Sequence, residues 1–309
     1  MKNSLLLLLT AIVTIGCGGG QKYASNTKLE RTILVTGATG TQGGAVAREL
    51  LDRGYRVRGL TRNNKSDRAN ALAEIGVEIV KGNFENRVSL VAAMNGVYGV
   101  FAMTDFWEHG YEKEVQHGLK LVEAALATGV QHFVYSSVAG ADANTGIPHF
   151  ESKAEIEARI RGSGINFSIV RPVEFMDNVR YHRDRILSGE YLDPRHSSRN
   201  HQWIAASDIG FFVGEAFDNP DEWAEQTLEI AGDQISIGEF VDSLSRIVGS
   251  EVKHRQLNWE DYEEQNGHEM AQMLRWFDAQ GYDADTTALR TRYPNLLTYE
   301  QYLRSLDWN

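Results

Sequence analysis

Short apolar runs and amphipathic segments alternate along the chain from residue 31 onward. Residues 31–36 form a β-branched run that ends in glycines, and residues 42–53 then carry apolar side chains at helical spacing. The apolar runs that predict strands are residues 31–36, 55–61, 77–81, 97–104, 132–136 and 166–171. The segments that predict helices are residues 42–53, 68–75, 87–94, 112–128 and 152–161. Strands and helices that alternate in this way predict an α/β fold, a Rossmann-type doubly wound parallel sheet.

The alternation becomes less regular after Pro172. The pattern there predicts helices over residues 181–187, 206–217, 237–248 and 260–280, and strands over residues 226–231 and 252–257. We therefore expect a Rossmann domain over residues 31–171 and a smaller, less regular C-terminal α/β lobe over residues 172–309. The lobe is expected to close one end of the cleft in the first domain.

The first 17 residues have the pattern of a signal peptide, because a charged start and an apolar run precede Gly16 and Cys17. The run is shorter than the roughly 18 apolar residues that a membrane span needs. It resembles the bacterial lipoprotein signal, in which the cysteine becomes lipid-modified after cleavage. We therefore expect lipid modification of Cys17, which would make the protein membrane-anchored or exported. A polar linker over residues 18–30 is expected to follow this segment. The alternative is an N-terminal extension on a cytoplasmic protein.

The composition of the chain excludes several kinds of binding partner and metal site. The chain holds 31 Lys and Arg against 42 Asp and Glu, which gives a net charge of −11 at pH 7. The sequence has no basic block that could follow a phosphate backbone, so we expect no direct binding of nucleic acid. Cys17 is the one cysteine, which excludes an intramolecular disulfide and a cysteine-based metal cluster. We expect no metal site, and membrane contact only through the N-terminal anchor.

A glycine-rich motif lies between the first predicted strand and the first predicted helix. Its residues are Gly37, Ala38, Thr39, Gly40, Thr41, Gln42 and Gly43. We expect Gly37 to permit the tight turn, Gly40 to let a pyrophosphate approach the backbone, and Gly43 to allow close contact between helix and strand. The start of the helix then offers N–H groups and the positive end of its dipole to phosphates. In this setting the motif predicts a dinucleotide-binding site.

Residues after the second, third and fourth predicted strands indicate which dinucleotide binds. Arg62 stands where NAD-specific proteins place a carboxylate on the ribose 2′-hydroxyl. Arg62, with Lys65 close behind, suits a 2′-phosphate, because arginine pairs with phosphate through two hydrogen bonds. The alternative is a solvated surface arginine. Asn83 and Phe84 are placed to meet the adenine and Thr104 to face the nicotinamide, so NADP(H) is the expected cofactor.

Several stretches together resemble the NmrA-like branch of the atypical short-chain dehydrogenases/reductases. They are residues 36–44, 60–63, 82–85, 95–108 and 149–157. The similarity extends over residues 31–309, and the tail, at residues 273–277 and 298–302, resembles the NmrA-like redox-sensor proteins. The resemblance implies NADP(H) binding. It leaves two activities open, because some members are redox sensors or transcriptional co-regulators and others are NADPH-dependent reductases of quinones or related compounds.

The resemblance also implies a changed catalytic pair. Active dehydrogenases of the wider superfamily carry Tyr-x-x-x-Lys, in which the lysine lowers the pKa of the proton-donating tyrosine. This chain has His149 in the tyrosine position and keeps Lys153. Lys153 is expected to hold the nicotinamide ribose. His149 could donate a proton, since imidazole titrates near neutral pH, or it could simply form part of a crevice wall.

Further residues are expected near the crevice on the same resemblance. Ser136 and Ser137 stand near the matching serine position at the end of the fifth strand, and the segment after the sixth strand contributes Phe175, Met176 and Asn178 as lining residues. His196 and His201 flank a basic loop, residues 195–200, that is expected to be solvated.

These features predict an NADP(H)-binding protein with a role as a redox-responsive sensor or regulatory binding protein. The alternative is an NADPH-dependent oxidoreductase that acts on quinones or related carbonyl compounds. The expected partners are accordingly NADP(H) and either a protein or a small carbonyl or quinone substrate.

Overall fold

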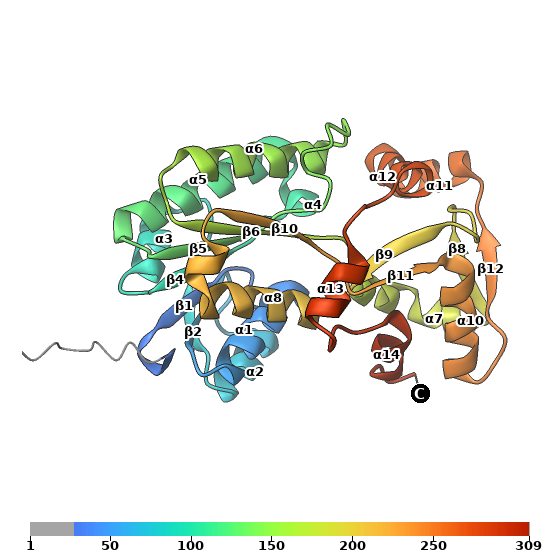
Figure 1. The fold of residues 1–309 in the computed structure, drawn as a ribbon, viewed down its shortest axis with the longest axis horizontal. Helices are drawn as coiled ribbons and strands as arrows, with labels where there is room; N and C mark the ends of the chain where they lie inside the picture. The colour runs from blue at the N-terminus through green and yellow to red at the C-terminus, as the bar shows by residue number, and fades with distance from the viewer. Residues whose placement is uncertain (1–27, 309) are drawn as a thin grey trace, which may run out of the picture.

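The computed structural model describes residues 28–308, and its largest sheet has seven parallel strands in the order β10-β6-β5-β4-β1-β2-β3 (Figure 1). The strands are β1 (Thr32–Val35), β2 (Arg56–Thr61), β3 (Glu78–Lys81), β4 (Gly99–Ala102), β5 (His132–Ser136), β6 (Phe167–Pro172) and β10 (Gln226–Ile230). The predicted doubly wound parallel sheet is confirmed. The signal-like segment with Cys17 lies outside the described residues.

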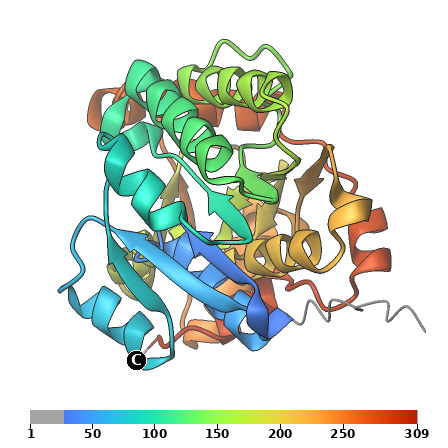
Figure 2. The ribbon, with the colours of Figure 1, turned by 90° about the vertical axis from the view of Figure 1, so that its left-hand side faces the viewer.

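Helices cover both faces of this sheet (Figures 1 and 2). One face carries α3 (Arg87–Met94), α5 (Tyr111–Thr128) and α6 (Pro148–Gly162), and the other carries α1 (Thr41–Asp52), α2 (Asp67–Glu74) and α8 (Ala206–Asp218). Side chains of β1 alternate between the two faces: Ile33 and Val35 pack in the core beside α1 and α8, and Leu34 packs in the core beside α5. Because both faces are covered, β1 is apolar at nearly every position.

The chain returns to this sheet after residue 171. Strand β10 pairs with β6 as the edge strand, and α8 packs along α1. Arg53 at the end of α1 donates to Glu215 and Asp218 of α8, at 2.7 and 2.8 Å. The expected boundary at residue 171 therefore does not separate the two parts in space.

The remaining C-terminal elements form the expected smaller lobe, which has two small sheets, one mixed and one parallel, at the right of Figure 1. One sheet pairs β9 (Asn200–Ile204) with β7 (Glu174–Phe175) and β11 (Asp233–Ser236), and the other pairs β8 (Glu190–Asp193) with β12 (Lys253–Gln256). The longer helices of the lobe are α10 (Ile237–Val248), α11 (Trp259–Asn266) and α12 (His268–Ala279). The short ones are η2 (Met176–His182), α7 (Arg183–Leu187), α13 (Thr286–Arg292) and α14 (Tyr299–Arg304). Three further short helices lie elsewhere, η1 (Lys28–Glu30), α4 (Phe106–His109) and α9 (Pro220–Trp223).

Several expected elements differ from the structure. The single helix expected over residues 260–280 is two helices, α11 and α12, because Gly267 adopts φ +88° and turns the chain between them. Strands β8, β9 and β11 were not predicted. These strands are short, and their sequences contain no long run of apolar residues that would predict a strand.

The parallel strands all end at the same edge of the large sheet, which brings the loops after β1, β2, β4 and β5 together. No helix among the residues described is both long and apolar enough to cross a membrane.

The close packing of α1 against β1 can be tested by a substitution at Gly43. A Cβ on Gly43 would lie 2.3 Å from the carbonyl oxygen of Gly37, whereas a Cβ on Gly162 at the end of α6 would meet nothing within 4 Å. We expect Gly43→Ala to lower the free energy of unfolding by about 1–3 kcal/mol through overpacking. Gly162→Ala, the matched control, should raise it by up to about 1 kcal/mol. Urea denaturation measures both, and equal effects would contradict the close contact.

Candidate cofactor site

The glycine-rich motif forms the turn from β1 into α1. Gly37 adopts φ +60°, and Gly40 is the N-cap residue of α1. Because glycine has no side chain that could cap the helix, the backbone N–H groups of the first turn are available to a ligand. Gly40 and Thr41 are exposed, Thr39 is half-buried and Ala38 is buried. The Gln42 amide donates to Ser136 Oγ at 2.5 Å and thereby joins the turn to the end of β5.

The residues expected at the adenosine end are mostly on the surface. Arg62 and Lys65 are exposed after β2, and both Nη atoms of Arg62 donate to the Glu108 carboxylate. Asn83 is exposed, and its Oδ1 accepts the Asn86 N–H at 2.9 Å. Phe84 is half-buried. Its ring packs edge-on against that of His117, with centroids 5.4 Å apart.

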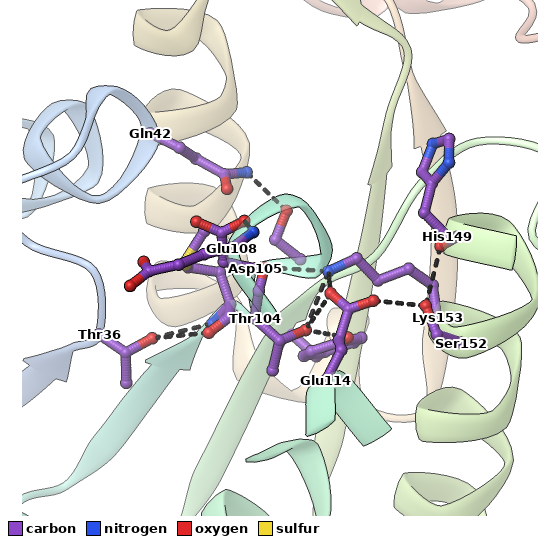
Figure 3. Close-up of polar contacts among 12 residues, drawn as sticks. Thr36, Gln42, Thr104, Asp105, Glu108, Glu114, His149, Ser152 and Lys153 are labelled. Atoms are coloured by element: carbon purple, nitrogen blue, oxygen red, sulfur yellow. Dashed lines mark hydrogen bonds and ion pairs between the residues drawn. The ribbon is translucent and has the colours of Figure 1, made fainter. Parts of the chain in front are cut away.

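A buried polar cluster lies at the opposite end, where Lys153 of α6 meets Glu114 of α5 and Thr104 after β4 (Figure 3). Lys153 Nζ donates to Glu114 Oε1 at 2.5 Å, to the Thr104 hydroxyl at 2.9 Å and to the Thr104 carbonyl at 3.1 Å. The second Glu114 oxygen accepts from the Ser152 hydroxyl. The fully buried Glu114 carboxylate therefore balances the positive charge of Lys153 directly.

Thr104 is used within this cluster rather than facing an open crevice. It is buried, and its hydroxyl donates to Glu114 Oε1 at 2.9 Å. The same hydroxyl lies 3.1 Å from the hydroxyl of Tyr135. Burial, together with the charge of Glu114, raises the pKa of Tyr135 well above its ordinary value, so Tyr135 is a neutral phenol behind Thr104.

His149 lies at the start of α6 among aromatic rings and is only 8% exposed. The ring centroids of Phe106, Trp107 and Phe150 are 5.7, 5.1 and 4.5 Å from that of His149. Burial, and next the charge of Lys153, lower the pKa of His149 to about 3, so its imidazole is neutral at pH 7. Its backbone N–H donates to Glu269 of α12 at 3.1 Å.

These residues fit a dinucleotide. The glycines provide a turn without side chains of their own, and a cleft of about 620 Å³ opens beside Thr39, Gly40 and Thr41, between this turn and the C-terminal lobe. Arg62, Thr104 and Lys153 are not among the residues that line this cleft. Two buried polar atoms, Ser137 Oγ and His149 Nδ1, have no hydrogen-bond partner among the described residues, although His149 Nδ1 lies 3.4 Å from Glu269 Oε1. Unpaired groups of this kind favour a ligand that supplies the missing partners.

Some expected site residues lie elsewhere. Met176 is fully buried in the core of the C-terminal lobe and is not available to a ligand. Phe175 is half-buried and packs against the core beside α1, and Asn178 is exposed. These positions depend on how the segment after β6 turns into the C-terminal lobe, which the strand pattern does not specify.

The loop over residues 195–200 was expected to be solvated, and this was wrong for its first residue. The Arg195 guanidinium is buried and donates to Asp193 and Glu174, at 2.7 and 2.6 Å. The two carboxylates balance the charge of the arginine, which is why it can be buried. His201 is also buried, whereas His196 is exposed.

Glu114 and Glu108 were not identified from the sequence. For Glu114 a signal was present, because it stands four and seven positions before Gly118 and Leu121 on the buried face of α5. A carboxylate on an apolar stripe requires a partner. For Glu108 no local signal exists, because its partner Arg62 is 46 positions away.

Among curated relatives, an NmrA-like family domain-containing protein of Dictyostelium discoideum is 26% identical over 305 residues, which span 91% of this chain and 99% of that protein. An NmrA-like family domain-containing oxidoreductase of Malbranchea aurantiaca is 30% identical over 263 residues, 75% of this chain and 77% of that protein.

Solved structures share the fold at lower identity. The negative transcriptional regulator NmrA in complex with NADP has a TM-score of 0.73 and 21% identity, and the match covers 91% of this chain and 99% of that one. An NADPH-dependent quinone oxidoreductase of Escherichia coli in complex with NADPH has a TM-score of 0.73 and 20% identity, with 88% and 98% covered.

A family model described as the NmrA-like family matches residues 29–303. This match spans nearly all of the described residues, including the returning strand β10 and the C-terminal lobe. The chain therefore belongs to the NmrA-like family.

Proposed function

We propose that this protein binds NADP(H) and acts as a cofactor-responsive sensor rather than as an efficient carbonyl reductase. One observation carries the proposal: Lys153 is paired with buried Glu114, and the tyrosine position one turn earlier holds a neutral histidine. At the expected nicotinamide end of the site, the described residues thus include groups that can bind and orient a ligand. None of them is an activated proton donor.

The reasoning follows from what carbonyl reduction requires. A bound nicotinamide supplies a hydride, and the substrate oxygen must then receive a proton. A neutral imidazole is a weak acid, so His149 gives up a proton far less readily than an activated tyrosine. Tyr135 is also unsuited, because its hydroxyl is buried behind Thr104 and its pKa is raised.

In this proposal the two ends of the dinucleotide are held by different parts of the chain. The N–H groups at the start of α1 bind the pyrophosphate, and Arg62 with Lys65 binds the 2′-phosphate. Lys153 orients the nicotinamide ribose by giving one of its three ammonium hydrogens, all of which contact Glu114 or Thr104 in the structure, to a ribose hydroxyl. The solved relatives that hold NADP or NADPH support this assignment.

A second candidate is reduction of quinones. Phe106 and Trp107 lie beside His149, and Trp107 is 54% exposed, so a flat aromatic acceptor could stack there. Reduction of a quinone builds charge on an oxygen conjugated through a ring, which needs no strong local acid. The quinone oxidoreductase of E. coli among the similar structures supports this alternative.

We also propose that the N-terminal segment is cleaved before Cys17 and that the cysteine is lipid-modified, which would anchor the protein to a membrane. The support is the short apolar run that ends in Gly16-Cys17. A single acyl chain binds a membrane only weakly, so stable attachment would need more than one acyl group on the protein.

The cofactor preference can be tested by binding. We expect NADPH to bind at least about ten-fold more tightly than NADH, since a charge-assisted contact to the 2′-phosphate is worth about 1.5 kcal/mol or more. Arg62→Asp should erase the preference, whereas Arg159→Asp on the exposed side of α6 should preserve it. Isothermal titration of the three proteins with each of the two dinucleotides decides this. Equal affinities in the unmodified protein would overturn the NADP(H) assignment.

The sensor role can be tested by turnover. We expect NADPH to be consumed no faster than background with simple aldehydes or ketones, and measurable turnover to be confined to quinones. His149→Tyr should raise activity toward simple carbonyls, by up to about 100-fold, because it restores a general acid near Lys153. The measurement is loss of absorbance at the NADPH band. Brisk reduction of simple aldehydes by the unmodified protein would show that another residue supplies the proton.

The N-terminus can be tested by mass spectrometry of the native protein. We expect a chain that begins at lipidated Cys17 and partitions into the membrane fraction. Cys17→Ser should abolish both the added mass and the partitioning. An unmodified chain that begins at Met1 would rule the lipid anchor out.

A further inference from the structure

Arg62, the residue assigned to the 2′-phosphate, is already occupied by a carboxylate of the same chain. Its Nη2 donates to Glu108 Oε2 at 2.9 Å, and its Nη1 donates to Glu108 Oε1. This is the two-point geometry with which a guanidinium also binds phosphate. Glu108 therefore stands where a 2′-phosphate would compete.

The pair crosses the mouth of the cofactor site. Arg62 follows β2, and Glu108 lies in α4 after β4, while β1 runs between these two strands in the sheet. The bridge thus passes over the carboxyl end of β1, where the glycine-rich turn begins. A dinucleotide laid across this turn would run beneath or through the Arg62–Glu108 contact.

Glu108 is held toward Arg62 by its own short helix. The Asp105 side chain accepts the backbone N–H of Glu108 at 3.1 Å, and the Gly110 N–H donates to the Phe106 carbonyl at 2.7 Å. Arg62 lowers the pKa of Glu108, so the carboxylate is ionised at neutral pH. The pair itself is exposed, and a pair of this kind contributes only about 0.2–1 kcal/mol.

The same helix reaches the other end of the site. Phe106 and Trp107 of α4 contact the His149 ring, while Glu108 contacts Arg62. The contact to Arg62 and the aromatic surface beside His149 therefore share one helical turn.

We propose that Glu108 is a competing carboxylate that makes the Arg62 side of the site responsive to a 2′-phosphate: its carboxylate occupies Arg62, and a 2′-phosphate displaces it, whereas a ribose 2′-hydroxyl does not. This rests on the proposed NADP(H) binding. A phosphate carries more charge and more acceptor oxygens than a carboxylate, so it wins the guanidinium, while a neutral hydroxyl cannot replace a two-point ionic contact. Displacement frees α4 at its Arg62 side and shifts Trp107 relative to His149.

The first test is a double-mutant cycle on dinucleotide affinity. Glu108→Gln should tighten NADP⁺ binding about two- to five-fold, the range that matches an exposed pair, and should leave NAD⁺ binding unchanged. Glu112→Gln, which removes the same charge from an exposed position in α5, should change neither affinity. In an Arg62→Gln background, Glu108→Gln should no longer affect NADP⁺ binding, because the competition acts through Arg62.

The second test measures the fluorescence of Trp107 when a dinucleotide binds. NADP⁺ should change the tryptophan emission of the unmodified protein, and the Trp107→Phe variant should lose most of that change. NAD⁺ should leave the emission unaltered, since it does not release α4.

The outcomes separate the two levels of the proposal. If the unmodified protein binds neither dinucleotide, the cofactor assignment falls and this inference falls with it. If NADP⁺ binds tightly but Glu108→Gln leaves its affinity unchanged, or strengthens NAD⁺ binding equally, only the competing role of Glu108 at Arg62 is overturned.

Discussion

The buried ion pair between Lys153 and Glu114 is the contact on which the arrangement of the site depends. It joins α6 to the first turn of α5, and the hydrogen bonds to Thr104 tie both helices to the end of β4. Neither charge could remain buried alone, because breaking such a pair from one side costs on the order of 3–5 kcal/mol. The pair therefore fixes where the ammonium of Lys153 lies relative to the cleft.

The C-terminal lobe completes the site from the other direction. Glu269 of α12 accepts the backbone N–H of His149, and Trp276 of the same helix packs against Phe150, with ring centroids 5.3 Å apart. The small lobe thus covers the start of α6 and buries the imidazole. This burial is the main reason that His149 is neutral, so the lobe sets the protonation state of a residue in the Rossmann domain.

The sequence by itself determined the first six strands of the large sheet and the position of the glycine-rich turn, but it did not place β10 in that sheet. Both depend on neighbours in the chain: the period of apolar positions sets strand and helix, and glycine at Gly37 permits the left-handed turn that precedes α1. The same local reasoning placed Lys153 one turn after His149. It failed for the single helix expected over residues 260–280, where the effect of Gly267 was overlooked, and for the short strands of the small lobe.

Only the tertiary structure decided which charges meet. Glu114 and Lys153 are 39 positions apart, and Arg62 and Glu108 are 46 positions apart, so no local pattern links the members of either pair. Likewise, Arg195 looked like a solvated loop residue until the fold brought Glu174, 21 positions away, to the guanidinium that its neighbour Asp193 also contacts. The physical reason is common to all three cases. A charge can be buried or held in place only by a partner of opposite sign, and which partner comes within reach is set by the packing of distant segments.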